Sequence, residues 1–105
     1  MTKKHWTNYE LKPIFDSHKS FNKKAYVHVD ERGNWVLESY GCMVCGYNNL
    51  NQFERYWSGY SATTMRHIKE FIYQFYKFGL GTNETEARLY ASSMNKKNWE
   101  NRKIY

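Results

Sequence analysis

The sequence contains no apolar run that could cross a membrane, since nothing in it approaches about 18 consecutive apolar residues. The N-terminal stretch MTKKHWTNYE carries charges but lacks the apolar core of a secretory signal. These absences predict a soluble, cytoplasmic protein with no membrane partner.

Cysteine is also scarce, with two in 105 residues, so we expect reduced thiols or metal ligands rather than a structural disulfide. Both lie in the motif CMVCG at residues 42–46, which has the shape of a zinc knuckle. Zinc bound by Cys42 and Cys45 would need two further ligands, for which His28 and His67 are the best candidates. The alternative is a continuous strand, in which the two thiols point to opposite faces and share no metal. We favour the absence of a cofactor, with zinc as the alternative.

Recognisable catalytic motifs are missing as well. The sequence has no phosphate-binding glycine loop and no paired acidic motif. Ser61 and His67 are nearly two helical turns apart, so their side chains would not meet on one helix. No carboxylate has a spacing that would orient the imidazole. We therefore expect a protein that is not an enzyme and has no small-molecule substrate.

Aromatic residues, by contrast, are abundant, and ten Tyr, six Phe and four Trp make up 19% of the chain. Each can bury about 150–250 Å², which compensates for the modest core of a small domain. Tyrosine packs its ring while its hydroxyl stays in water, and this suits a binding surface. The alternative is that tyrosine replaces leucine in the core.

The formal net charge is +6, and it is concentrated at the two ends of the chain. Residues 1–24 carry +4, residues 25–60 carry −2, and residues 61–81 and 82–105 carry +2 each. This distribution favours nucleic acid or another acidic partner, bound through the basic ends rather than the middle. The alternative is that the basic ends only aid solubility. The cations available for such contacts are Lys3, Lys4, Lys23, Lys24, Arg66, Lys69, Lys96, Lys97 and Arg102.

The order of patterns along the chain predicts one α+β domain over residues 1–105. Residues 1–19 have no clear periodicity, and Pro13 limits helix there, so we expect an irregular basic arm. Alternating residues over 24–57 predict an antiparallel meander of three to four strands.

One long amphipathic helix is predicted over residues 61–78, with Ser61 as its N-cap. Its apolar stripe follows helical spacing and consists of Met65, Ile68, Ile72 and Phe75. Arg66 and Glu70 are four residues apart and can form an ion pair. We expect the stripe to pack across one face of the sheet.

A shorter C-terminal helix is predicted over residues 83–94. Asn83 and Glu86 have the three-residue spacing of a capping box at its start. Residues 95–105 are polar and basic, and we expect them to form a tail.

Three stretches resemble a group of small proteins from phages and related mobile elements of Gram-positive hosts. They are SFNKKAYV at 20–27, LESY at 37–40 and WSGYSATTMRHIKEF at 57–71, and the third is the most specific. The resemblance covers about residues 20–75 and brings no established activity, cofactor or catalytic residue. The shared pattern does not require cysteine at positions 42 and 45, which argues against zinc.

The resemblance implies a non-enzymatic protein that docks on a host protein or nucleoprotein complex in the host cytoplasm. Its most concrete form is a host-defence inhibitor of the anti-CRISPR kind. A small DNA- or RNA-binding accessory protein is the alternative, and a zinc-stabilised interaction module is the second alternative. The residues expected to contact the partner are Lys23, Lys24, Tyr26, Tyr60, Arg66, Lys69 and Tyr73.

Overall fold

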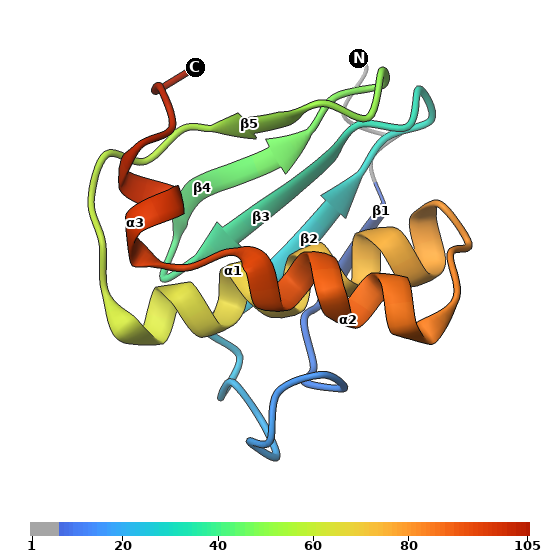
Figure 1. Ribbon diagram of the computed structural model, residues 1–105, viewed down its shortest axis with the longest axis horizontal. Helices are drawn as coiled ribbons and strands as arrows, with labels where there is room; N and C mark the ends of the chain where they lie inside the picture. Colours follow the sequence, from blue (N-terminus) through green and yellow to red (C-terminus); the bar gives the residue numbers. More distant parts are fainter. Residues whose placement is uncertain (1–6) are drawn as a thin grey trace.

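A computed structural model describes residues 7–105. Its strands are β1 (Thr7–Glu10), β2 (Ala25–Val29), β3 (Trp35–Ser39), β4 (Cys42–Tyr47) and β5 (Phe53–Arg55). Its helices are α1 (Ala62–Gln74), the π-helix η2 (Phe75–Gly79), α2 (Glu84–Ser93) and α3 (Lys96–Glu100). The α+β class agrees with the sequence prediction. The antiparallel sheet has five strands in the order β1-β2-β3-β4-β5, rather than three to four (Figure 1).

The additional strand, β1, lies within the segment expected to be an irregular arm. It pairs with β2, and Tyr9 lies opposite Val27. The sequence TNYE has no apolar alternation, so its extended form depends on pairing with β2 and not on its own pattern. Leu11 follows the strand and is fully buried. Residues 1–6 of the expected arm lie outside the described residues.

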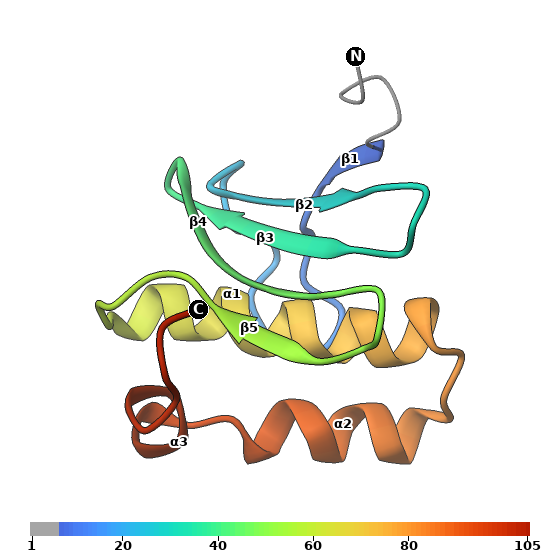
Figure 2. The same ribbon diagram turned by 90° about the horizontal axis from the view of Figure 1, so that it is seen from above.

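The molecule has three layers, with α1 in the middle. Figure 2 shows α1 between the sheet and α2. The predicted stripe of α1 is buried, as Met65 and Ile72 illustrate with exposed fractions of 6% and 3%. Tyr73 is also buried, because α2 covers a second face of the same helix, and its hydroxyl donates to Glu84 of α2. The middle position of α1 explains why nine of its thirteen residues are buried.

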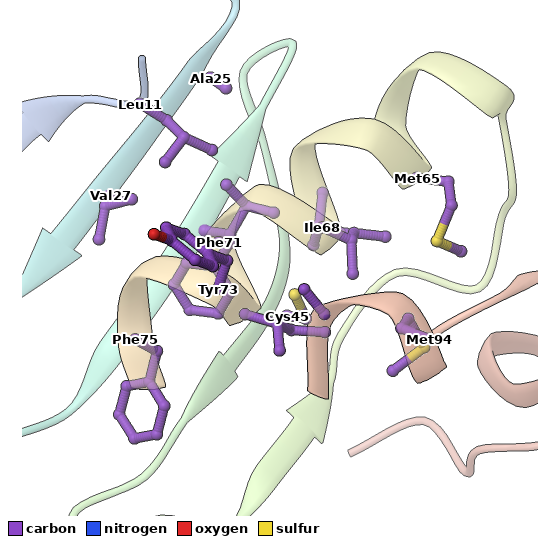
Figure 3. Close-up of a cluster of buried hydrophobic side chains, with 14 of the residues drawn as sticks. Leu11, Ala25, Val27, Cys45, Met65, Ile68, Phe71, Tyr73, Phe75 and Met94 are labelled. Carbon is purple, nitrogen blue, oxygen red and sulfur yellow. The ribbon is translucent and has the colours of Figure 1, made fainter. Parts of the chain in front are cut away.

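The core lies between the sheet and α1. Figure 3 shows Leu11, Val27 and Ala25 on the sheet side, facing Ile68 and Phe71 of the helix. Phe75 continues this contact beyond α1, and its ring stacks on Tyr47 of β4 with centroids 3.8 Å apart. The aromatic residues therefore supply much of this small core.

Helix ends confirm the predicted caps. Ser61 Oγ accepts a hydrogen bond from Thr64 N at 3.0 Å, and Asn83 Oδ1 accepts one from Glu86 N at 2.8 Å. The end of the long helix differs from the prediction, because Leu80 N donates to Phe75 O and closes a wider π turn. Within the described residues, no helix combines the length and apolar character needed to cross a bilayer.

The basic tail contains a helix that the sequence did not predict. In α3, Trp99 is fully buried, and its Nε1 donates to Gly59 O at 2.8 Å. Further on, Ile104 forms a parallel bridge with Arg55 of β5. Burial of this large ring contributes to the order of the polar segment, together with the hydrogen bonds that Arg55 donates to Trp99 O and Arg102 O.

Candidate functional site

Exposed cations gather on the segment between β1 and β2 and on the neighbouring part of α1. Figure 1 shows this segment as a blue loop that extends beyond α1. Lys12, Lys19 and Lys23 line one open hollow together with Glu10. We define the basic surface by its exposed cations, Lys12, Lys19, Lys23, Lys24 and Arg66.

Glu70 fixes the loop to α1 from beneath. Its carboxylate is fully buried and accepts hydrogen bonds from Phe15 N at 2.9 Å and Asp16 N at 2.8 Å. Gln74 Nε2 donates to the same carboxylate and to Lys12 O, both at 2.8 Å. The predicted pair of Glu70 with Arg66 is therefore wrong, because the carboxylate faces backbone amides in the interior. These bonds hold the loop in one position.

Aromatic packing holds the loop at a second point. The ring of Phe15 stacks on Tyr73, with centroids 5.6 Å apart, and the guanidinium of Arg88 lies over both rings. The hydroxyl of Tyr73 donates to Glu84 at 2.7 Å. Tyr73 was expected to contact a partner, but only 2% of it is exposed, so it supports the loop from within the core.

Arg66 joins the loop to the exposed side of α1. Its Nη1 lies 3.7 Å from Asp16 Oδ1 and 2.7 Å from His18 Nδ1. Lys69 follows one helical turn later and is half-buried. The structure therefore brings Arg66 next to the lysine-rich loop, as a shared contact surface requires.

Lys23 and Lys24 project from a tight turn. Lys24 N donates to Phe21 O at 3.0 Å, while Asn22 and Lys23 have φ of 55° and 59°. This is the left-handed geometry of a type I′ turn, in which glycine usually follows asparagine. Lys23 takes the place of that glycine, and such strain in a residue with a side chain is typical of functional segments.

Tyr40 lies beside this turn and was not identified from the sequence. Tyr40 N donates to Lys24 O at 2.8 Å, and 56% of the residue is exposed. Its φ of 52°, with 78° at Gly41, makes a second two-residue turn between β3 and β4. The Tyr-Gly pair within the alternating segment 24–57 was the available signal. Tyr40 adds an exposed aromatic ring to one side of the basic surface.

The remaining expected contact residues lie elsewhere. Tyr26 is on the outer face of the sheet, which is the face away from α1, between Glu10 and Glu38. Tyr60 precedes α1 and has Lys96 of α3 5.5 Å from its ring centre. The basic surface therefore includes Lys23, Lys24 and Arg66 from the predicted set. Lys3 and Lys4 lie outside the described residues.

The side chain of His67 packs against both of these turns, the one at Asn22 and Lys23 and the one at Tyr40 and Gly41. Its Nδ1 lies 2.8 Å from Ser39 Oγ, and both residues are buried. Phe21 and Tyr40 cover the imidazole, with ring centroids 4.5 and 5.7 Å away. Burial lowers the pKa of His67 to about 4, although Asp16 acts in the opposite direction. A neutral imidazole is thus part of the structure that holds the turns.

Acidification is expected to destabilise the protein through His67. The folded pKa of about 4 lies below the ordinary 6.5, so the unfolded chain takes up a proton first as the pH falls. The contribution of the neutral His67 imidazole to the free energy of unfolding is fully present above about pH 6.5. It is lost as the pH falls towards 4. We expect a loss of about 2 kcal/mol from this residue between pH 7 and pH 4.5.

Urea unfolding of the wild type and of His67→Gln at both pH values measures this effect. The variant should lose about 2 kcal/mol less than the wild type between the two pH values. Both proteins keep Asp16 and the other carboxylates, so their contributions cancel in the comparison. An equal loss of stability in both proteins would contradict the prediction.

The four proposed zinc ligands are not brought together. The register shifts between Leu37, which lies opposite Cys45, and Glu38, which lies opposite Met43, so Val44 is an extra residue. This bulge corrects the prediction of opposite faces, since Cys42 and Cys45 are both on the side towards α1.

The proposed ligands nevertheless differ in exposure and in hydrogen-bond partners. Cys42 is exposed, whereas Cys45 is buried, and burial raises the pKa of its thiol. His28 lies on the outer face and is hydrogen-bonded to Asn8 and Glu38 at 2.6 and 2.8 Å. Over residues 7–105, no cluster of three or more His, Cys, Asp and Glu side chains could hold a metal ion.

A comparison with family models gives one match. A family of unknown function, DUF8033, matches residues 9–100, which run from β1 to the end of α3 and include the whole basic surface. No curated protein and no solved structure matches the chain.

Proposed function

Since this chain belongs to the DUF8033 family of unknown function, we propose its role from its own surface: it is a non-enzymatic protein that docks on a negatively charged partner. The contact is made by the basic surface. Five cationic side chains lie there, against the surface carboxylates of Glu10 and Asp16. Asp16 is already engaged by Arg66 and His18.

The anchoring of the lysine-rich loop is the observation that carries this proposal. A free basic segment would bind by charge alone and would lose conformational entropy on docking. Here the buried side chains of Glu70 and Gln74 hold the backbone of Lys12, Phe15 and Asp16. The backbone of the loop between Lys12 and Asp16 therefore starts from a fixed position, so less backbone entropy is lost when an acidic partner binds.

A nucleoprotein complex is the partner that we propose. Phosphates would contact the lysines, and the exposed ring of Tyr40 beside them can stack on a base or fill a shallow protein pocket. The most concrete form of this role is a phage-type host-defence inhibitor of the anti-CRISPR kind. That form is supported by the sequence resemblance over residues 20–75.

Direct binding of DNA or RNA is the second candidate function, and the same lysines favour it. Binding through phosphates releases counterions, so the logarithm of the affinity falls linearly with the logarithm of the salt concentration. With five cations in contact, the expected slope is about −4.5 for a duplex. Measurable affinity for free nucleic acid with this slope would favour the second candidate.

Charge reversal on the basic surface tests the proposal. The double variant Lys19→Glu/Lys23→Glu is expected to bind its partner at least about tenfold more weakly, since two attractive contacts become repulsive. The matched control is Arg32→Glu/Lys103→Glu, which changes the charge by the same amount at exposed positions elsewhere. The control should bind as the wild type does.

Partner capture from host lysate is measured with and without nuclease, and anisotropy titrations use a short labelled DNA duplex and a single-stranded RNA. A protein or nucleoprotein that is captured by the wild type and the control but not by the double variant supports docking. Recovery of nucleic acid alone favours the second candidate. Equal binding by both variants would exclude the basic surface as the contact.

A further inference from the structure

A separate pocket lies between the turn after β4, the π-helix and α2. Its volume is about 240 Å³, and it shares no lining residue with the hollow of the basic surface. Figure 2 shows the turn between β4 and β5 near the C-terminal end of α1. The lining of the pocket includes Tyr47, Asn51, Tyr76, Tyr90 and Arg102.

Stacked rings make the walls of this pocket rigid. Tyr76 of the π-helix stacks on Tyr90 of α2, with centroids 4.1 Å apart and an angle of 8° between the rings. Tyr47 of β4 stacks on Phe75. The N–H and hydroxyl of Thr82 both donate to Tyr76 O, at 2.9 and 3.0 Å, and fix the π turn. Single π turns within helices occur often at functional sites, because they re-aim one side chain.

Hydrogen-bond donors surround the pocket. The Arg102 guanidinium lies over the ring of Phe53, 4.6 Å from its centre, and pairs with no carboxylate among residues 7–105. Burial raises the pKa of the phenols of Tyr47 and Tyr76, so both keep their protons at neutral pH. Asn51 holds a left-handed φ of 63° at the edge of the pocket.

We propose that this pocket binds a small organic acid. The carboxylate or phosphate of the ligand is held by Arg102 and by the hydroxyl of Tyr76, which accepts a hydrogen bond from Tyr47 and keeps its own proton for an oxyanion. The short body of the ligand lies against the aromatic walls. Since ligand pockets usually have volumes of about 300–1,000 Å³, a pocket of 240 Å³ takes a ligand with a single small ring.

NMR titrations with three probes test this inference. Benzoate supplies a carboxylate, phenyl phosphate supplies a phosphate, and benzyl alcohol is a neutral molecule of similar size. We expect saturable shifts of the Asn51, Tyr76 and Tyr90 amides with at least one of the acids, and no saturable shift with the alcohol. The stronger acid identifies whether the natural ligand carries a carboxylate or a phosphate.

Two variants and one control locate the contact. Arg102→Gln should weaken binding of the preferred acid at least about tenfold, and Tyr76→Phe should weaken it severalfold while the ring stack is kept. The control Lys103→Gln removes the neighbouring positive charge and should leave the affinity unchanged. Circular dichroism confirms that each variant is folded. The inference is overturned if neither acid shows saturable binding, if the alcohol binds equally well, or if Arg102→Gln binds as the wild type does.

Discussion

Replacement of Arg55 by alanine is expected to lower the free energy of unfolding by about 3–5 kcal/mol, the largest effect of any single substitution that we predict. Arg55 is only 5% exposed, and its guanidinium lies 4.5 Å from the ring centre of Trp99. The guanidinium donates to four backbone carbonyls, those of Trp57, Ser58, Trp99 and Arg102. Alanine would leave these acceptors without their donor and would detach α3 from β5.

Lysine at position 55 separates the effect of charge from that of shape. An ammonium group keeps the charge but cannot reach four carbonyls from the positions that a planar guanidinium occupies. We expect Arg55→Lys to lose about 2–3 kcal/mol and the exposed control Arg32→Lys to lose less than about 0.5 kcal/mol. Chemical denaturation measures the free energy of unfolding of Arg55→Ala, Arg55→Lys and Arg32→Lys against that of the wild type. Wild-type stability in Arg55→Lys would show that the charge alone is sufficient.

Glu70→Gln is the second substitution with a large expected effect, a loss of about 1.5–3 kcal/mol. The carboxylate accepts from Phe15 N, Asp16 N and Gln74 Nε2. An amide of the same shape has one acceptor oxygen fewer. Its NH2 group would place two N–H donors opposite N–H groups that are themselves buried donors. The effect should be local, because the bonds that are lost hold the loop and not the sheet.

Native-state hydrogen exchange distinguishes local from global loss. In Glu70→Gln the amides of Phe15 and Asp16 should exchange faster than those of β3, whereas the exposed control Glu100→Gln should change neither. Partner binding should weaken as well, because the backbone of the lysine-rich loop loses its fixed position. Unchanged exchange at Phe15 would contradict the role of Glu70 as the anchor of the loop.

Local patterns in the sequence were sufficient to predict the helices that carry them. The spacing of Met65, Ile68 and Ile72 identified the buried side of α1, and Ser61 and Asn83 cap their helices as expected. Each of these signals operates within one or two turns of chain. The α+β class followed because the alternating segment and the helical segment were distinct.

Features that depend on distant partners could not be predicted. The strand Thr7–Glu10 exists because β2 lies beside it, and the bulge at Val44 follows from its pairing with β3. Glu70 looked like a surface charge, because helical spacing placed Arg66 four residues away. Its actual partners, Phe15 N and Asp16 N, are 55 and 54 residues distant. Nothing in a local window indicates such contacts.

The bridge between Arg55 and Ile104 affects how readily two molecules could pair through their β5 strands at high concentration. Tyr105 N also donates to Arg55 O, at 2.6 Å, so the last residues of the chain occupy hydrogen-bonding positions along β5. An uncovered outer strand is a template for intermolecular pairing and aggregation. The tail therefore covers part of β5, and another molecule could pair with β5 at Arg55 only after Ile104 and Tyr105 had been displaced.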